Sequence, residues 1–436
     1  MKKSIRSIML GGGILLCLAM MFTSCEGEFD DLFGEWSRPA PAETPTPTEK
    51  KGSISFAKST ELKHFGDGNF TNDLTNTGDG TVTYTSSNTA VATVNPTTGE
   101  VTPVDVGTAT ITATVTESGE YTYEKKTAQY ELGVGVSILK WDETLKALKA
   151  EDVTTGVTLT GTIDPATITA GTYIIYGNAT ISGNLEPTDA VNLILLDGSK
   201  LQINGYINVP SSAPATAALS IYAQSEGDDK GQLTVTTDTY NAITCYKGMN
   251  IHGSKITAET TGGLDCHGFF VSNDMKIYGG HVSATGSDNY SSLSPGYGIC
   301  AFLGNLLITG KAIVKATGGT SSNSAPGGNG ISGKVTISGQ ASLTATGGDS
   351  GLSGGHGIDG NLTISGDAKF TAIGGKSSYP STIYRNGILG TLTNECSASV
   401  DFETSSDGTS WDGTYTLTNV SPGNSGSVSK CGIRKL

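Results

Sequence analysis

Two glycine-rich segments have the residue types that could bind a phosphate group. Gly328–Gly333 fits the pattern G-x-G-x-x-G, and together with Lys334 it nearly forms a P-loop. Such a motif binds phosphate where it leads from a strand into a helix, because the amides of the helix N-terminus face the ligand. In this chain the pattern recurs at Gly355–Gly360, both copies open onto alternating β-branched residues, and Val335 stands where a magnesium-binding Ser or Thr is needed. The sequence therefore favours a structural repeat over a nucleotide site.

Residues for hydrolytic or lyase chemistry are sparse. Gly351–Gly355 satisfies G-x-S-x-G, but a nucleophile elbow needs a strand that leads into a helix. A glycoside hydrolase needs two facing carboxylates, and a lyase needs a base with an arginine or a metal ion to stabilise the developing charge. The repeats offer no obvious carboxylate pair and a single arginine, Arg385. We therefore predict that the protein is not an enzyme; a polysaccharide lyase or hydrolase is the alternative.

Aromatic residues in long loops are better candidates for a functional site, and the function they favour is binding. A tyrosine ring can stack on a sugar ring while its hydroxyl pairs with sugar oxygens. The alternative role of each ring is to hold its loop against the neighbouring sheet. The loops that vary in length are Gly286–Gly298, Gly318–Gly330, Gly347–Gly357 and Gly374–Gly387. The predicted ligand-binding residues in these loops are Tyr290, Tyr297, His356, Tyr379, Tyr384 and Arg385.

These loops lie between copies of a repeated sequence motif, here called the phrase, and the elements formed by that motif must position the loops. Copies of the phrase begin at Met249, Met275, Leu306, Val335 and Leu362, with a degraded copy at Leu392. Within a copy, apolar and hydroxyl residues alternate with a period of two, which is typical of a strand with one buried face. Stacking such units buries their apolar edges and brings the loops to one side. The isoleucines expected to form one inward column are Ile251, Ile277, Ile308, Ile337 and Ile364.

The sequence thus predicts an all-β protein in which a parallel β-helix spans residues 137–400. The phrase G-I-x-G-x-LTISG-x-A-x-LTATGG resembles secreted β-helical carbohydrate-binding modules, some of which bind pectic polysaccharide, and repeats of bacterial surface adhesins. The resemblance covers about Gly156–Ser399. It implies a noncatalytic surface that binds a polysaccharide or a host or cell-surface ligand.

The N-terminus predicts export and anchoring. Residues 1–24 combine three basic residues with an apolar run, which is typical of a signal peptide, and Cys25 follows where bacterial lipoproteins are lipidated. Residues 25–50 are acidic and then proline-rich, as expected of a semi-rigid tether. The acidic run after Cys25 is similar to the signal that sends some Gram-negative lipoproteins to the outer face of the outer membrane. We expect a protein anchored there through lipid only, exposed on the cell surface.

Short alternating strands between turn signals occupy residues 51–136 and predict a small β-sandwich. The segment resembles bacterial Ig-like group 2 modules and is interpreted as a spacer. Between it and the repeats, Trp141–Leu148 has the pattern of a short amphipathic helix, which we expect to cap the first coil. Residues 401–436 are expected to cap the other end.

The net charge and the cysteines limit the kinds of partner and metal ion that the protein is expected to bind. The chain has a net charge of −14, and the mature protein, which loses three positive residues with the signal, carries −17. This sign disfavours nucleic acid. No cofactor is predicted; the acidic residues are scattered, so a Ca²⁺ site has no assigned location. Zinc is disfavoured because no C-x-x-C pair occurs, whereas a bond between Cys396 and Cys431 is one open pairing. A structural surface protein without a ligand is the remaining alternative.

Overall fold

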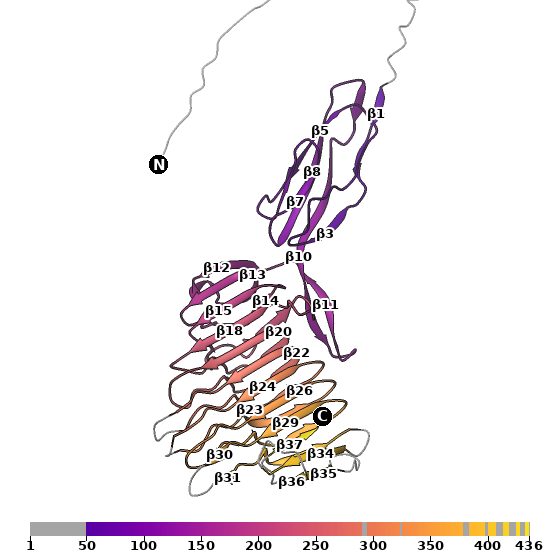
Figure 1. The fold of residues 1–436 in the computed structure, drawn as a ribbon. Helices are drawn as coiled ribbons and strands as arrows, with labels where there is room; N and C mark the ends of the chain where they lie inside the picture. The colour runs from indigo at the N-terminus through magenta and orange to yellow at the C-terminus, as the bar shows by residue number, and fades with distance from the viewer. Residues whose placement is uncertain are drawn as a thin grey trace, which may run out of the picture. The chain divides into compact units, whose positions relative to one another are not determined.

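The structure is a computed structural model, which describes residues 49–289, 294–322, 325–377, 383–396, 400–406, 413–417, 424–427 and 432–435. Lys50–Leu436 forms one compact unit. The described part is all-β, as predicted, and its one helical element is the 3₁₀ turn η1, Pro165–Thr167 (Figure 1). Within these ranges no helix combines the length and the apolar character needed to cross a membrane.

The N-terminal strands form an Ig-like domain of small sheets in which antiparallel and parallel pairs both occur. Its strands are β1 (Lys50–Gly52), β2 (Ile54–Phe56), β3 (Thr60–His64), β4 (Leu74–Asn76), β5 (Thr81–Ser86), β6 (Ala92–Val94), β7 (Val101–Pro103), β8 (Gly107–Thr116), β9 (Tyr121–Tyr123) and β10 (Thr127–Asp142). Strand β10 pairs antiparallel with β8 and parallel with β3. Alternate residues of β8 are buried, so this strand contributes one face to the core. Ile111, Tyr130 and Leu132 lie at the centre of that core.

The prediction of a helix at Trp141–Leu148 is wrong. Strand β10 continues to Asp142, the chain turns, and β11 (Ala147–Val153) runs back antiparallel to it. The carboxylate of Asp142 does accept the backbone N–H groups of Thr144 and Leu145, at 2.8 and 2.9 Å. These hydrogen bonds close a turn and do not start a helix, because β11 finds its backbone partners by pairing with β10. Leu145, which was expected on the apolar side of the helix, is 63% exposed.

The C-terminal part, which we call the repeat region, is a continuous sheet of mostly parallel strands. Its strands are β12 (Val157–Ile163), β13 (Gly171–Ser182), β14 (Val191–Leu195), β15 (Lys200–Asn204), β16 (Ile207–Val209), β17 (Leu219–Ala223), β18 (Gln232–Thr237), β19 (Ile243–Cys245), β20 (Met249–Thr260), β21 (Phe269–Val271), β22 (Met275–Thr285), β23 (Ile299–Ile308), β24 (Ile313–Thr317), β25 (Ile331–Ile337), β26 (Ser342–Thr346), β27 (Ile358–Asp359), β28 (Leu362–Ile364), β29 (Lys369–Ile373), β32 (Ile388–Leu389) and β33 (Thr391–Asn394). A strand pairs with its counterpart in the next repeat, and we call each such repeat a coil. Strands β30 (Lys376–Ser377) and β31 (Ile383–Tyr384) form a separate pair.

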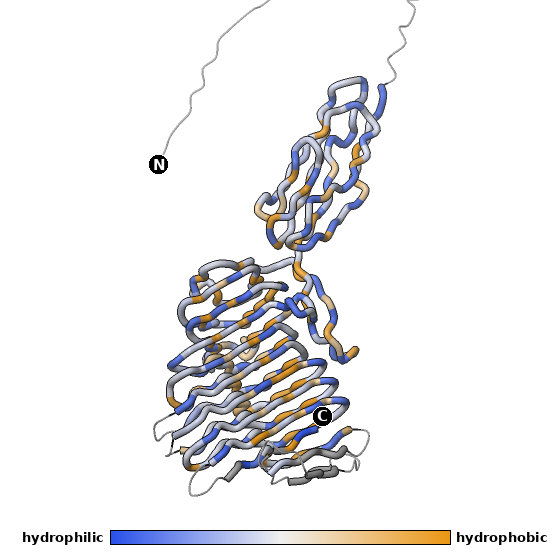
Figure 2. The backbone as a smooth tube through the Cα atoms, in the orientation of Figure 1, coloured by the Kyte–Doolittle hydropathy of each residue, from blue (hydrophilic) through white to orange (hydrophobic). Residues whose placement is uncertain are grey.

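The predicted isoleucine column is confirmed by the strand register. Ile251 pairs with Ile277, Ile277 with Ile308, Ile308 with Ile337, and Ile337 with Ile364. All five side chains are fully buried. Figure 2 shows apolar and polar residues alternating along these strands. Because each isoleucine lies over the same residue of the next coil, the column buries a continuous aliphatic core.

Antiparallel strands follow the last parallel strands. They are β34 (Val400–Ser405), β35 (Gly413–Leu417), β36 (Asn424–Ser427) and β37 (Gly432–Lys435). Strand β36 pairs with β33, and β37 pairs with both β29 and β34. The stack of parallel strands therefore ends in strands of opposite direction. Cys396 is buried nearby, whereas Cys431, its predicted partner, lies outside the described residues.

The glycines of the G-x-G-x-x-G pattern allow backbones to approach each other. A Cβ atom added to Gly330 would lie 2.6 Å from the carbonyl oxygen of Gly357 in the next coil and 2.6 Å from the amide nitrogen of Thr346. Gly357 has the same relation to Gly387, at 2.6 Å. Backbone atoms on both sides leave no room for a side chain. These positions therefore hold neighbouring coils together, in agreement with a structural repeat.

Substitution of Gly330 by Ala should destabilise the protein by about 1–3 kcal/mol, because the added methyl group meets backbone that cannot move away. Denaturant unfolding of both proteins measures the change. Gly68→Ala is the matched control, since a Cβ atom there has no neighbour within 4 Å. Equal stability of the Gly330 variant and the wild type would contradict the packing explanation.

Candidate ligand-binding surface

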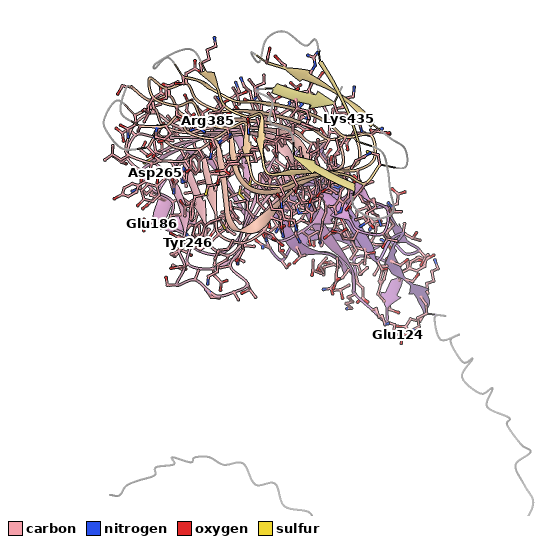
Figure 3. The ribbon with its side chains drawn as sticks, turned by 90° about the horizontal axis from the view of Figure 1, so that it is seen from below. Glu124, Glu186, Tyr246, Asp265, Arg385 and Lys435 are labelled. Atoms are coloured by element: carbon pink, nitrogen blue, oxygen red, sulfur yellow. The ribbon has the colours of Figure 1, made fainter. Side chains whose placement is uncertain are left out.

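The predicted loop residues do not form one site. Tyr290, Tyr379 and the predicted lipid-attachment residue Cys25 lie outside the described residues. Tyr384 lies in β31, where its backbone pairs with Lys376. Arg385 is exposed, and its Nε donates to the hydroxyl of Ser353 at 2.5 Å (Figure 3).

Tyr297 and His356 belong to a ladder of side chains that connects neighbouring coils. The ladder occupies the position just before the residues Ala242, Gly268, Gly298, Gly330, Gly357 and Gly387. Its members are Asn241, His267, Tyr297, Asn329, His356 and Asn386. Several of them accept the backbone N–H of the next member, so the ladder has a structural role.

Four contacts define this ladder. The amide oxygen of Asn241 accepts the N–H of His267 at 2.7 Å, and Nδ1 of His267 accepts the N–H of Tyr297 at 2.9 Å. Two coils further, Asn329 accepts the N–H of His356 at 2.7 Å, and Nδ1 of His356 lies 3.3 Å from the backbone oxygen of Asn386. Asn241, His267 and Asn329 each present one acceptor atom at the same place, whereas Nδ1 of His356 faces a carbonyl oxygen and can only donate.

Burial keeps the ladder residues uncharged. Desolvation lowers the pKa of His267 from 6.5 to about 4, and burial is also the main cause that lowers the pKa of His356. Burial likewise raises the pKa of the Tyr297 hydroxyl. A neutral imidazole can accept a backbone N–H through Nδ1, whereas a protonated one cannot. At His267, whose Nδ1 accepts the N–H of Tyr297, the geometry and the lowered pKa therefore agree.

An exposed aromatic strip lies beside this ladder. The rings of Tyr246 and Phe270 are 5.7 Å apart between centroids, and those of Phe270 and Phe302 are 5.9 Å apart. The three residues come from successive coils, after β19, within β21 and within β23. Phe302 is 64% exposed and Tyr246 is 37% exposed. We call these three residues the aromatic strip; Figure 3 labels Tyr246 within the repeat region.

His267 connects the ladder, and through it Tyr297, to the aromatic strip. The ring of Tyr297 stacks on His267 with centroids 4.8 Å apart, and His267 in turn lies 5.9 Å from Phe270 in a stacked orientation. One predicted binding residue thus belongs to the wider aromatic cluster, although its backbone contact is structural.

A polar groove of about 430 Å³ runs close to the strip. Exposed Leu303, next to Phe302, forms part of its wall. The polar residues that line the groove are Lys247, Asn250, Asn273, Asp274 and Lys276. The carboxylate of Asp274 accepts two hydrogen bonds from Asn305, at 2.9 and 3.3 Å, which fixes its orientation. The groove presents amide, ammonium and carboxylate groups, and Lys247 and Leu303 of its lining directly follow Tyr246 and Phe302 of the strip in the chain.

Sequence reasoning missed the aromatic strip. Tyr246, Phe270 and Phe302 occupy no common position in the repeated phrase, and none lies in the variable loops that were selected. A signal was nevertheless present, because a large aromatic residue at an outward strand position, such as Phe270, exposes apolar surface unless a ligand or partner covers it. Finding it requires the register of Phe270 with Thr244 and Cys300.

Metal-ligand groups are absent from the described residues, and the cysteines described there are buried. No group of three or more His, Cys, Asp or Glu side chains within the described ranges is arranged to hold a metal ion. Cys245, Cys266 and Cys300 are buried, as predicted. Burial raises the pKa of Cys245 and Cys266, and it raises that of Cys300 to about 12, so these thiols are poor nucleophiles.

Comparison with known families supports the N-terminal assignment. Residues 56–125 match the family described as bacterial Ig-like domain (group 2). The prediction of an Ig-like domain of this kind within residues 51–136 is therefore confirmed. No curated protein matches the chain.

The ladder predicts a pH effect on stability. Because folding lowers the pKa of His267 from 6.5 to about 4, the unfolded chain binds the proton first as pH falls. The stabilisation is complete above pH 6.5 and is lost between pH 6.5 and 4, by up to about 1.4 kcal/mol per pH unit. His267→Asn should retain the acceptor and lose less stability over this range, as measured by denaturant unfolding at each pH.

His267→Ala serves as the comparison variant. It removes the acceptor for the N–H of Tyr297 and should be less stable than His267→Asn at every pH. A fall in stability between pH 6.5 and 4 that is as steep in both variants as in the wild type would show that another group carries the effect.

Proposed function

We propose that the protein is a noncatalytic, lipid-anchored surface protein that binds glycan through its repeat region. The observation that carries the proposal is the aromatic strip of Tyr246, Phe270 and Phe302 beside a polar groove. Rings on adjacent coils can stack on successive sugars, while the groove supplies donors and acceptors for hydroxyl groups. This combination suits a sugar chain better than a purely apolar ligand.

The architecture proposed for the repeat region is a parallel β-helix. Its support is the register, in which β14, β17, β20 and β22 pair in parallel with residues of like type aligned. A solenoid of this kind provides a long rigid surface on which ligand groups repeat with the coils. An extended polymer can therefore contact several coils at once.

The remaining parts of the chain fit presentation at a cell surface. A lipid on Cys25 would hold the protein at the outer membrane, and the acidic and proline-rich segment 25–50 would extend away from it. The Ig-like domain would then act as a spacer. Bacterial Ig-like domains of group 2 are compatible with this role, which rests here on the order of the segments.

Two alternatives predict different outcomes. A polysaccharide lyase or hydrolase would release unsaturated products or reducing ends from its substrate. A structural surface protein would bind no glycan and would associate with copies of itself. A strip of exposed rings next to a polar groove supports a binding surface, and assays for released products and for self-association separate the two alternatives from it.

Glycan-array binding tests the proposal. The mature chain with Cys25→Ser should bind specific glycans, and Phe302→Ala should weaken this binding about tenfold, because it removes an exposed stacking ring. Ile313→Ala is the matched control, since Ile313 is 48% exposed on another strand, β24. Binding that is equal in all three proteins would reject the strip as the site. Binding to host proteins alone would replace glycan recognition with protein adhesion.

A further inference from the structure

A second set of aromatic rings forms a stack across the repeat region. Tyr222, His252 and Tyr278 come from β17, β20 and β22. Their ring centroids are 4.7 Å apart between Tyr222 and His252 and 4.9 Å apart between His252 and Tyr278. The ring of Trp141, from β10, continues the stack at 5.0 Å from Tyr278, with an interplanar angle of 17°. The spacing of the rings is close to the spacing of paired strands.

Trp141 is held in this position by several contacts. Its backbone N–H donates to Nδ1 of His252 at 3.0 Å. The side chain of Trp141 also hydrogen-bonds to the carboxylate of Glu143. The hydrogen bond from Lys146 is the main cause of the lowered pKa of Glu143, and the bond from Trp141 is the second cause. The ring lies over Gly310, where an added Cβ atom would come within 3.1 Å of it. The hairpin of β10 and β11 thus places an indole where the coil itself has no side chain.

The stack ends at Trp141 and a groove begins there. This groove has a volume of about 480 Å³, and both Trp141 and Tyr278 line it. Its floor consists of Gly310 and, one coil further, Gly339, whose Cβ position would point at the backbone of Gly310. Because both positions are glycine, no side chain fills the space over the floor. A flat group can lie there as the ring that would follow Trp141 in the stack.

Polar side chains surround the open position. Lys311, Gln340 and Lys146 line the groove together with the carboxylate of Glu226. Lys311 and Glu226 form an ion pair at 3.0 Å, with both side chains largely exposed. The groove therefore offers donors and an acceptor around one aromatic face, which is the arrangement that recognises a ring bearing hydroxyl groups. A purely apolar ring would gain nothing from these groups.

We propose that this groove binds one pyranose ring of a glycan, stacked on Trp141 above Gly339. The sugar ring takes the next place in the series Tyr222, His252, Tyr278 and Trp141, and its hydroxyls bond to Lys311, Gln340 and Glu226. The site shares no residue with the aromatic strip. It rests on the proposed function only in that the ligand is a glycan.

The decisive variant fills the space above the floor. Gly339→Asn places a side chain there, and asparagine tolerates the positive φ of 68° at this position better than most residues. Gly161→Asn is the matched control, because Gly161 has φ 69° and does not line the groove. Both variants carry similar backbone strain, but only the first lies next to Trp141.

The experiment uses the mature chain with Cys25→Ser and three probes, cellohexaose, xylohexaose and maltohexaose, together with any glycan retained on the array. Calorimetry measures affinity, and the indole N–H signal of Trp141, assigned through Trp141→Phe, reports contact by NMR. A bound probe should shift this signal. Gly339→Asn should weaken its binding at least about tenfold, equivalent to the loss of one stacked ring, while Gly161→Asn stays within about twofold of the wild type.

A further variant guards against a folding defect. Gln340→Ala changes one side chain at the rim without backbone strain, and it should weaken binding by several fold. The inference is overturned if glycans bind without shifting the Trp141 signal, or if both asparagine variants bind equally well; the proposed function survives either result. If no probe binds and the array retains no glycan, the proposed function fails as well.

Discussion

The close approach of one coil to the next governs the whole repeat region. Parallel strands pair at a fixed spacing, so each residue lies over its counterpart one coil away. Where backbones come closest, at Gly330 and Gly357, only glycine fits. Where side chains point inward, at Ile308 and Ile337, like residues stack into a dry core. Most of the other features follow from this register.

The same register turns single residues into columns with different roles. Asn241 and His267 each use one acceptor atom to bind the backbone of the following coil. Burial keeps the imidazole neutral, which the contact requires. On outward positions, rings align instead, and the result is an exposed strip in one place and an internal stack in another. The structural columns and the surfaces proposed for binding therefore arise from one geometry and differ mainly in exposure.

The hairpin of β10 and β11 adds what the coils do not supply. It leaves the Ig-like domain as part of β10 and carries Trp141 onto Tyr278 and Gly310. Leu148 of β11 lies against Gly279, where an added Cβ atom would come within 2.7 Å of its side chain. Glycines in the coils thus make room for the hairpin. The junction between the two regions is built from side-chain contacts as well as from the chain connection.

Much of this protein follows from its sequence alone. Alternation with a period of two determined which residues are buried, and the repeated phrase determined the column from Ile251 to Ile364, because both depend only on local spacing. The strands of the Ig-like domain were predictable for the same reason.

The two surfaces that we propose for binding were decided by the tertiary structure. Tyr246 and Phe302 lie more than fifty residues apart and meet through Phe270 only once the coils are in register. The segment at Trp141 has a helical pattern, yet it forms strands, because pairing within the hairpin and stacking on Tyr278 outweigh a weak local preference. Sequence spacing determines which face a residue takes, whereas contacts between coils determine which side chains that face brings together.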